Sequence, residues 1–488
     1  MNARAFIIFA VCLGLCAAAG TLVAQVTETN LYSFGSVPNE GAWPSAGLVQ
    51  GSDGNFYGTC SYGGANDHDE GTVFKIDPRG VEATLYTFLG SYASPSDGNS
   101  PQAPLVQGSD GNFYGTTAAG GSNTSVSTVG YGTVFRINPV TGLETNLYSF
   151  GSYSNDGTAP VGGLVLGRDG NFYGTTSGGG TYGDGTVFRI TPGGVYTNIY
   201  SFGGTPTDGN WPYAGLVLGN DGNFYGTTAG GGSNAYFTGI GTVFKITTNG
   251  TETVLYSFGS DYPDGNDGYG PRTPLVQGSD GNFYGTTRVG GTNYLGNGTV
   301  FRISPGGSYT SLYSFNGYPT DGASPYAGLV QGSDGNFYGT TVQGGTDLAG
   351  TIFEISPGGS YSNLYSFTGY ANNDGYGPQA PLVQGSDGNF YGTTFYGGIA
   401  AGNVFRLTVP LSSPANQIIA IQIAGTNVLV SIPSVAGEKY QLQDRTSLTT
   451  GAWVDVTGQV NSIGGLLTLT NFGGFSQPQQ FYRFAITP

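Results

Sequence analysis

The sequence predicts an all-β protein: a seven-bladed β-propeller of four-stranded blades, closed by the N-terminal strand, followed by a small C-terminal β-sandwich. Three observations carry this prediction. The string Asp-Gly-Asn-Phe-Tyr-Gly-Thr occurs seven times, at intervals of 52 to 59 residues. Each copy is followed by a Gly-Thr-Val-Phe element or a close variant, and a Leu-Tyr-Ser-Phe-like element recurs seven times. Repeats of this length that divide into four short strands are typical of propeller blades.

The first repeat shows how one blade is expected to form. Asp53 and Gly54 supply a hairpin turn, because glycine accepts a positive φ angle and aspartate tolerates it. Phe56 and Tyr57 follow the turn and point to opposite faces of a strand, so both faces of the sheet are expected to be buried between neighbouring blades. The four strands are expected at Ala46–Gln50, Asn55–Thr59, Gly71–Ile76 and Ala83–Phe88.

The strand count at the two ends of the repeats predicts a closed ring. Thr29–Phe34 has the pattern of a fourth strand, but no blade precedes it. The last repeat has its first three strands, at Pro381–Gln384, Asn389–Thr393 and Asn403–Thr408, and lacks the fourth. The spare N-terminal strand can complete the last blade, which favours a closed ring over an open solenoid.

The repeated strings LVQGSDGNFYGTT and GTVF resemble the tandem GloVer repeat of secreted bacterial proteins, over about Asn30 to Arg406. That family is named for its repeat, so the resemblance implies an architecture and no particular activity. The pattern is also similar to NHL-type propeller blades, in which a PxGLAVDxxGNIYV hairpin takes the place of LVQGSDGNFYGT.

The first 24 residues have the features of a secretory signal peptide. Arg4 precedes an uncharged apolar run at Ala5–Ala19, which is shorter than the roughly 20 residues that span a membrane. Cleavage is expected after Ala24, with cleavage after Ala19 as the alternative. We therefore expect a secreted protein, extracellular or at the cell surface, with the periplasm as another location, and with the propeller at 25–410.

A linker at 411–417 is expected to lead to the C-terminal β-sandwich at 418–488. The stretch KYQLQDRTSLTTGAW and the closing QFYRF look like the immunoglobulin-like or fibronectin-like modules of secreted bacterial proteins. Six short strands in this region fit a small sandwich. They are expected at Ile418–Ile423, Val428–Ile432, Tyr440–Gln443, Trp453–Val456, Leu466–Leu469 and Phe481–Ile486.

The charge of the chain excludes some partners. Fourteen Lys and Arg against 30 Asp and Glu give a formal net charge of −16. Such a surface repels phosphate backbones and anionic lipid, so no nucleic acid is expected as a partner. The expected mature chain has no further long apolar segment, so no membrane span is expected, and we expect a monomer. Cys60 is alone in the expected mature chain, so the fold must rest on its core rather than on a disulfide.

Acidic residues recur in the loop between the fourth strand of one blade and the first strand of the next. Each precedes a glycine and lies four residues before a proline. Seven such acids around one face could bind a cation, with calcium as the candidate and no cofactor required, or a polyhydroxy ligand. The alternative is that each acid caps its own turn. The series is Glu40, Asp97, Asp156, Asp208, Asp267, Asp321 and Asp374.

Other residues offer less chemistry. The aspartates of the Asp-Gly-Asn turns are explained by hairpin geometry, and His68 is expected on a solvated acidic loop. A basic residue recurs in the third strand of six repeats, which suggests an ion pair between blades or a stem packed along aromatic rings. No nucleophile elbow, zinc spacing, phosphate loop or dinucleotide fingerprint is present.

These features favour a non-catalytic secreted or cell-surface binding protein that uses one propeller face, with an extracellular polysaccharide or another cell-surface component as partner. One alternative is a carbohydrate-active hydrolase or lyase with carboxylates at the propeller mouth, since two acids can meet across a ring without a local motif. The other is a purely structural envelope or matrix protein. No catalytic residue is identified.

Overall fold

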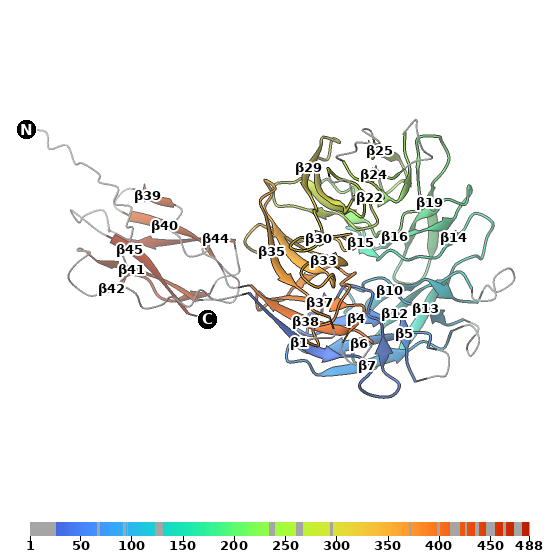
Figure 1. The fold of residues 1–488 in the computed structure, drawn as a ribbon, viewed down its shortest axis with the longest axis horizontal. Coiled ribbons are helices and arrows are strands. Elements are labelled where there is room, and N and C mark those ends of the chain that lie inside the picture. Colours follow the sequence, from blue (N-terminus) through green and yellow to red (C-terminus); the bar gives the residue numbers. More distant parts are fainter. Residues whose placement is uncertain are drawn as a thin grey trace, which may run out of the picture.

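The computed structural model describes residues 26–65, 69–90, 94, 96–122, 130–233, 240–259, 267–292, 296–369, 372–397, 401–409, 420–424, 427–434, 439–445, 454–461, 465–472 and 481–487. The predicted signal peptide, the predicted linker and His68 lie outside them. The described part is all-β and β-propeller-like, with seven four-stranded antiparallel sheets arranged around a common centre (Figure 1). Among these residues, no helix is long and apolar enough to cross a membrane.

The sheets are numbered 1 to 7 by the order of the repeats. Sheet 1 contains β3 (Val49–Gln50), β4 (Phe56–Cys60), β6 (Thr72–Ile76) and β7 (Glu82–Thr87). Sheet 2 contains β9 (Val106–Gln107), β10 (Phe113–Thr117), β12 (Thr133–Ile137) and β13 (Glu144–Ser149). Sheet 3 contains β15 (Val165–Leu166), β16 (Phe172–Thr176), β18 (Thr186–Ile190) and β19 (Tyr196–Ser201). Sheet 4 contains β21 (Val217–Leu218), β22 (Phe224–Thr228), β24 (Thr242–Ile246) and β25 (Glu252–Ser257).

The remaining sheets repeat this pattern. Sheet 5 contains β26 (Val276–Gln277), β27 (Phe283–Thr287), β28 (Thr299–Ile303) and β29 (Tyr309–Ser314). Sheet 6 contains β31 (Val330–Gln331), β32 (Phe337–Thr341), β34 (Thr351–Ile355) and β35 (Tyr361–Ser366). Sheet 7 contains β36 (Val383–Gln384), β37 (Phe390–Thr394), β38 (Asn403–Thr408) and the N-terminal strand β1 (Thr27–Ser33).

The strand β1 pairs antiparallel with β38 from Thr27↔Thr408 to Ser33↔Asn403. The predicted pairing of the N-terminal strand with the last repeat is therefore confirmed, two residues earlier at its start and one at its end than expected. Two strands almost 400 residues apart in the sequence, β1 and β38, are therefore joined in one sheet.

Short two-stranded pairs connect the loops on one side of the sheets. They join the loop that enters a repeat to the loop after its second strand, and Tyr269↔Val289 and Tyr376↔Tyr396 make the same connection through single bridges. The pairs are β2 (Gly41–Ala42) with β5 (Tyr62–Gly63), β8 (Gly98–Asn99) with β11 (Ala119–Gly120), β14 (Gly157–Thr158) with β17 (Gly178–Gly179), β20 (Gly209–Asn210) with β23 (Gly230–Gly231), and β30 (Gly322–Ala323) with β33 (Gln343–Gly344).

The Asp-Gly-Asn turns end the first strand of each sheet on the opposite side. In the first turn, Gly54 has φ +81° and nothing within 4 Å of the position a Cβ would take. Asp53 accepts hydrogen bonds from the Asn55 side chain (2.7 Å) and the Tyr57 hydroxyl (2.8 Å). The same bonds recur in all seven copies, so these aspartates have the structural role expected of them.

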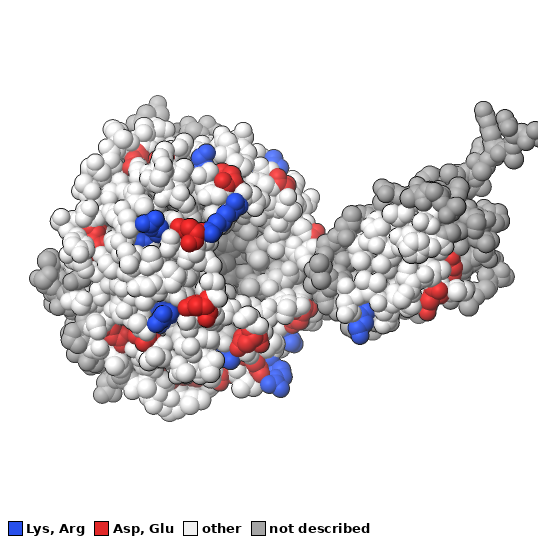
Figure 2. Space-filling model, turned by 180° about the vertical axis from the view of Figure 1, so that it is seen from behind, with Lys and Arg blue, Asp and Glu red and all other residues white. Residues whose placement is uncertain are grey.

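Charged side chains of both signs surround the hollow on the face that Figure 2 shows. The basic residue that recurs in the third strand contacts the Asp-Gly-Asn turn in the first repeat. There the Lys75 ammonium lies 3.0 Å from the Asp53 carboxylate and over the Tyr57 ring. The ion pair lies within one repeat, whereas the sequence suggested a pair between blades. The alternative of a stem packed along an aromatic ring fits Lys75.

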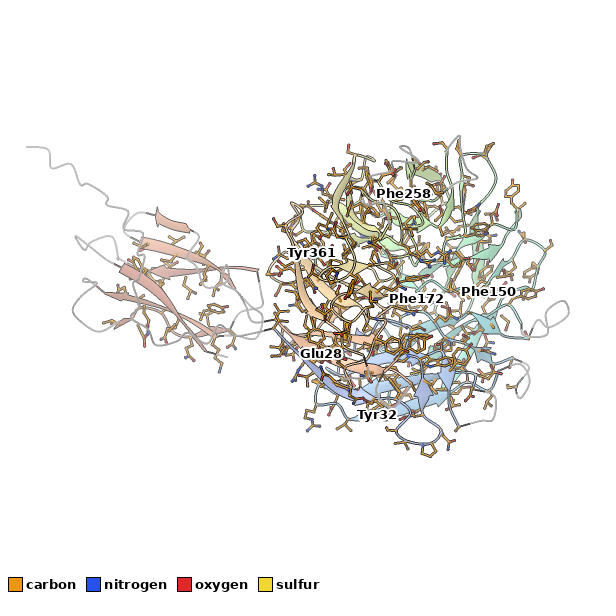
Figure 3. All side chains as sticks on the ribbon, viewed as in Figure 1. Glu28, Tyr32, Phe150, Phe172, Phe258 and Tyr361 are labelled. Atoms are coloured by element: carbon orange, nitrogen blue, oxygen red, sulfur yellow. The ribbon has the colours of Figure 1, made fainter. Side chains whose placement is uncertain are left out.

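Neighbouring sheets are held together by the two aromatic residues that follow each turn. Each Tyr stacks on the Phe of the next repeat at centroid distances of 3.9 to 4.2 Å, as in Tyr114 on Phe172. Phe172 and Phe150 belong to one cluster of buried side chains between sheets 2 and 3 (Figure 3). The predicted burial of both faces is confirmed, since such clusters lie between every consecutive pair of sheets. Full burial of such a ring is worth roughly 1.5–3 kcal/mol.

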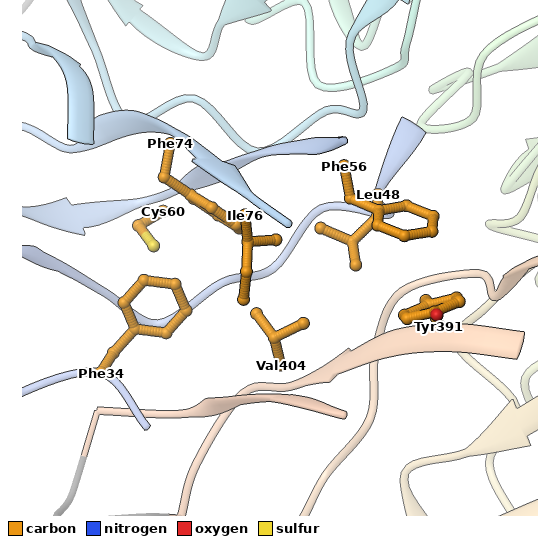
Figure 4. Close-up of a cluster of buried hydrophobic side chains, with 8 residues drawn as sticks. All are labelled: Phe34, Leu48, Phe56, Cys60, Phe74, Ile76, Tyr391 and Val404. Carbon is orange, nitrogen blue, oxygen red and sulfur yellow. The ribbon is translucent and has the colours of Figure 1, made fainter. Parts of the chain in front are cut away.

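Sheet 7 contacts sheet 1 in the same way. Tyr391 stacks on Phe56 with ring centroids 4.1 Å apart. Phe34, which follows β1, is fully buried in the cluster between these two sheets (Figure 4). The Ser386 amide donates to the Gln50 side chain (2.9 Å), a bond that four other pairs of neighbouring sheets also make. The contacts that join consecutive repeats therefore also join the last repeat to the first.

The first strand of each repeat is shorter than predicted. The expected strand began at Ala46, but β3 contains two residues. The residues before it turn toward the neighbouring repeats: the Thr393 hydroxyl of repeat 7 donates to the Ala46 carbonyl (3.4 Å), and Gly47 lies so close to Pro381 that a Cβ would come within 2.9 Å of that ring. Contacts with the neighbouring repeat replace the strand ladder at this point.

The C-terminal residues form two small antiparallel sheets, in which one strand was not predicted, β43. One sheet has β39 (Ala420–Ala424), β40 (Asn427–Ser434) and β44 (Gly465–Asn471); the other has β41 (Lys439–Arg445), β42 (Val454–Asp455), β43 (Val460–Asn461) and β45 (Phe481–Thr487). Val430 and Ile432 of one sheet and Tyr440 and Leu442 of the other share one buried cluster. The predicted domain boundaries stay predictions.

Candidate functional site

The predicted acidic series lies in the loops between consecutive sheets. Its six aspartates are buried, with exposed fractions of 2 to 6 %, and Glu40 is half-buried. Each carboxylate accepts a hydrogen bond from the tyrosine of the preceding fourth strand, as Glu40 does from Tyr32. The other pairs are Tyr86–Asp97 (3.0 Å), Tyr148–Asp156 (2.7 Å), Tyr200–Asp208 (2.9 Å), Tyr256–Asp267 (2.9 Å), Tyr313–Asp321 (2.8 Å) and Tyr365–Asp374 (2.8 Å).

Backbone amides of the same loop also donate to these acids. The Asp97 carboxylate accepts hydrogen bonds from the backbone amides of Leu89 and Gly98, each with a nitrogen–oxygen distance of 2.7 Å. Burial raises the pKa of Asp97, although these amides and the Tyr86 hydroxyl act to lower it. The contacts are those of the turn-capping alternative. Within the described ranges, no group of three or more His, Cys, Asp or Glu is placed to hold a metal ion. The calcium role stays a prediction.

A second set of acids, which sequence reasoning missed, lies beside the first. Glu28, Glu82, Glu144 and Glu252 each occupy the start of a fourth strand or the residue after it. Burial, together with the charge of an acid from the loop series, raises the pKa of Glu28 and Glu144 to about 8 and that of Glu82 and Glu252 to about 7. The acid from the loop series is Asp374 for Glu28, Glu40 for Glu82, Asp97 for Glu144 and Asp208 for Glu252.

The other three repeats place a tyrosine at this position. Tyr196 stacks on Tyr148 (4.1 Å), and Tyr309 and Tyr361 make the equivalent stack. Because the glutamates and the tyrosines replace one another in the repeat, this position belongs to the packing between neighbouring sheets rather than to a ligand site.

A cavity of about 190 Å³ lies at the centre of the seven sheets. We call the loop that leads from the fourth strand of one repeat to the first strand of the next the entry loop. All seven repeats line the cavity through the short segment between the proline of this loop and the first strand. We call the opening lined by these segments the mouth. It is on the side of the entry loops, the face that the sequence predicted for ligands, and opposite the Asp-Gly-Asn turns.

The residue before each of these prolines fixes the mouth segments in place. It has a positive φ in every repeat, including +57° at Trp43 and at Trp211, which costs non-glycine residues on the order of 1–3 kcal/mol each. Hydrogen bonds offset this cost. The Trp43 amide donates to the Ala401 carbonyl of the previous repeat (2.8 Å), and the Trp43 carbonyl accepts the Ser61 amide of its own repeat (3.2 Å). The mouth is therefore a preorganised backbone frame.

The residue after the proline is the variable part of this frame. Its neighbours on both sides are nearly the same in every repeat, namely proline before and a small residue, glycine or proline, and leucine after. We call these side chains the post-proline residues. They all line the cavity and are Ser45, Gln102, Val161, Tyr213, Arg272, Tyr326 and Gln379.

Aromatic and cationic side chains lie among the post-proline residues and next to them. The Arg272 guanidinium lies 4.7 Å from the centre of the Tyr213 ring, and Arg288 lies 4.8 Å from that of Tyr326. Trp43, two residues before Ser45 in the sequence, contacts the rings of Tyr62 (4.5 Å) and Phe395 (5.8 Å). Aromatic faces with adjacent polar groups suit ligands that have both apolar faces and hydroxyl groups.

Sequence reasoning did not single out the post-proline residues. The signal that could have found them was the contrast between one freely varying position and its nearly constant neighbours. The predicted elements consist of residues that recur, whereas this site consists of residues that differ from one repeat to the next. The two sets overlap in location, because the post-proline residues lie five positions after the acids of the loop series.

These features define an all-β, β-propeller-like tandem-repeat protein with a central cavity. The chain belongs to the Gloeobacter/Verrucomicrobia repeat family, whose model matches residues 18–126, 91–275 and 241–428. This agrees with the resemblance to the GloVer repeat. No curated protein matches the sequence.

Several solved structures are similar at low identity. A GH74 enzyme from Niastella koreensis is 13 % identical, with a TM-score of 0.49, over 92 % of this chain and 73 % of that one. The periplasmic gluconolactonase PpgL from Pseudomonas aeruginosa is 14 % identical, with a TM-score of 0.42, over 88 % and 98 %. A GH74 xyloglucanase from Xanthomonas campestris is 13 % identical, with a TM-score of 0.43, over 84 % and 60 %. Similarity at this level says nothing about the activity of this chain.

Proposed function

We propose that this chain is a secreted, non-catalytic binding protein that holds a glycan at the mouth of a closed seven-bladed β-propeller. The closed ring is supported by the contacts between sheets 7 and 1, which repeat those between consecutive sheets. The shared cluster of the two C-terminal sheets supports a β-sandwich of immunoglobulin-like or fibronectin-like type. Secretion to the extracellular space, cell surface or periplasm rests on the N-terminal sequence alone.

The observation that carries the binding function is the variability of the post-proline residues on a constant frame. A rigid scaffold with one freely varying position that is at least partly exposed in each repeat is how repeat proteins build binding surfaces. The side chains at this position include two tyrosines, two glutamines and a serine, which combine ring faces with hydrogen-bonding groups. Sugars offer the matching chemistry, with apolar ring faces and hydroxyl groups.

A carbohydrate-active hydrolase is the second candidate, and the composition of the mouth disfavours it. Glycoside hydrolysis commonly requires two carboxyl groups about 5 to 9.5 Å apart at the scissile bond. None of the described residues that line the cavity is Asp, Glu, His or Cys. A purely structural role would leave the variation of the post-proline residues without an explanation.

The test combines a glycan array with hydrolysis assays on plant and microbial polysaccharides. We expect binding without release of reducing ends, and at least about tenfold weaker binding by the Tyr213→Ala/Tyr326→Ala variant, since two aromatic contacts are lost. Tyr153→Ala is the matched control, because Tyr153 is 71 % exposed and lies outside the mouth. Release of reducing ends would show a hydrolase. Neither binding nor hydrolysis would favour a structural protein.

A further inference from the structure

Positive charge is concentrated on one side of the mouth of this acidic protein. Repeat 5 supplies both arginines: Arg272 lines the mouth at the post-proline position, and Arg288, directly after the second strand, lies over the ring of the mouth residue Tyr326. The backbone segments that carry them are joined, because the Tyr269 amide donates to the Val289 carbonyl at 2.9 Å. The two guanidinium groups therefore come from adjoining segments of one repeat.

Each arginine is oriented by a tyrosine from a different neighbour. Arg272 lies over Tyr213 of repeat 4, and Arg288 over Tyr326 of repeat 6, so both tyrosines are themselves post-proline residues. A cation over a ring gains electrostatic attraction and loses side-chain freedom before any ligand arrives. The result is a fixed arc of two guanidinium groups between two aromatic rings.

Neither arginine is neutralised within the part of the chain that the structure describes. The ion pairs found there are Lys75–Asp53 and Arg79–Asp77. The Nε atom of Arg288 is buried and has no hydrogen-bond partner among these residues. The nearest acid of the loop series in sequence, Asp267, accepts bonds from the Tyr256 hydroxyl and the Gly259 amide.

The net charge of −16 does not forbid an anion at this place. Charges interact over about 8 Å at physiological ionic strength, so acids farther than this from the two arginines are screened. Guanidinium groups match carboxylates and sulfates in charge and in donor geometry. The post-proline residues Gln102 and Gln379 add uncharged hydrogen-bonding groups elsewhere on the same opening.

We infer that the ligand of the mouth is an anionic glycan, whose carboxylate or sulfate groups contact Arg272 and Arg288 while its sugar rings contact the adjacent aromatic side chains. This inference rests on the proposed glycan-binding function and adds the charge of the ligand. Uronate and sulfated chains share the chemistry that the arginines recognise, so the experiment includes both.

The test is calorimetric titration of the full mature chain with three defined probes. These are hexagalacturonate, the same hexasaccharide with its carboxylates methyl-esterified, and a sulfated chondroitin hexasaccharide. We expect at least one charged probe to bind about tenfold or more tightly than the esterified probe, because each charged hydrogen bond contributes strongly. Added salt should weaken the binding of the charged probe and leave that of the neutral probe nearly unchanged.

Two variants separate the charge from the rest of the mouth. Arg272→Gln/Arg288→Gln should lose the preference for the charged probe, and the single Arg272→Gln variant, which changes only an exposed side chain, should lose part of it. The control is Arg168→Gln, because Arg168 lies in the turn on the opposite face and is also exposed. Thermal melting establishes that each variant folds.

The outcomes test two statements separately: that the mouth binds a glycan, and that this glycan is anionic. Equal affinity for the charged and esterified probes, or an unchanged preference in both arginine variants, would overturn the inference. The glycan-binding function would survive that result if Tyr213→Ala/Tyr326→Ala still weakened binding. A chain that binds no glycan on an array would overturn both. A preference for the sulfated probe over hexagalacturonate would support the inference and identify the anion as sulfate.

Discussion

The two ends of the repeat differ in how freely their residues vary. At the turn end, Asp-Gly-Asn-Phe-Tyr-Gly-Thr is identical in seven copies. At the mouth end, the post-proline position contains Ser, Gln, Val, Tyr or Arg within an almost constant frame. The Phe-Tyr-Gly-Thr part of this string is a buried strand, but its Asp-Gly-Asn turn lies at the surface, as the mouth loops do, so exposure to solvent alone does not explain why that turn is constant.

The hydrogen bonds of the two ends explain it. Each turn aspartate bonds to the asparagine and tyrosine of its own hairpin, and that tyrosine stacks on the next repeat. A substitution there breaks several contacts together. At the mouth, the backbone before the proline makes the fixed contacts, and the side chain after it faces the cavity. The scaffold therefore constrains the turn end and leaves the mouth end free for recognition.

The largest effect is expected from removing the strand that joins the last repeat to the first. Deleting residues 26–34 exposes the edge of β38 and removes the fully buried Phe34. Phe34→Ala alone should cost about 3–5 kcal/mol of the free energy of unfolding, and the deletion should cost more and promote aggregation. Urea unfolding and light scattering measure both. A deleted chain with unchanged stability would show that the fold does not depend on β1.

A smaller loss of stability is expected as the pH rises from about 5 to 9. The pKa of about 8 for Glu28 and Glu144, and about 7 for Glu82 and Glu252, lies above the ordinary value of 4.5. The folded state therefore binds these protons more tightly than the unfolded state. The associated stability is present below the unfolded pKa and is lost through about pH 7 to 8, on the order of 1 kcal/mol or more for each glutamate.

Asp53, in the turn of the first repeat, changes the stability with pH in the opposite direction. Burial raises the pKa of Asp53, but hydrogen bonds from Asn55, Tyr57 and Lys75 together lower it to about 2. That contribution is lost as the pH falls below about 4. Stability measured by urea unfolding should therefore be greatest near pH 4 to 6, and Glu144→Gln should reduce the loss on the alkaline side. A free energy of unfolding independent of pH from 5 to 9 would contradict the buried glutamates.

A direct comparison of the two ends uses one substitution at each. Asp110→Ala at the turn end should cost about 1–3 kcal/mol, because it leaves the Tyr114 hydroxyl and the Asn112 side chain without their acceptor. Gln379→Ala at the mouth end should change stability by less than about 0.5 kcal/mol. Chemical denaturation measures both. Equal losses would mean that the mouth residues also support the fold.

The smallest effect is expected from calcium. The aspartates of the loop series are already bonded to tyrosine hydroxyls and backbone amides, so the melting temperature should be the same in millimolar calcium and in chelator. A cation at a hundredfold excess over its Kd would instead stabilise the fold by about 2.7 kcal/mol. A calcium-dependent shift that Asp208→Asn/Asp321→Asn removes would turn these turn caps into a cation site.

Much of the scaffold could be predicted because its information is local and repeated. The alternation at Phe56 and Tyr57 places them on opposite faces of a strand, and the Asp53–Gly54 dipeptide requires a turn, without knowledge of any distant residue. Repetition also made the spare strand at the N-terminus recognisable. The first strands came out too long in the prediction because Ala46 and Gly47 contact repeat 7, which lies more than 330 residues away in sequence.

The sequence by itself thus determined the number of repeats, the order of strands within each and the pairing partner of the N-terminal strand. Only the tertiary structure decided which side chains meet at the centre. Arg272 and Tyr213 are 59 residues apart, and Glu144 and Asp97 are 47 apart, so no local pattern connects them. Packing seven nearly equal sheets around a common centre brings the equivalent post-proline positions together at the mouth and places a fourth-strand glutamate beside an acid of the loop series.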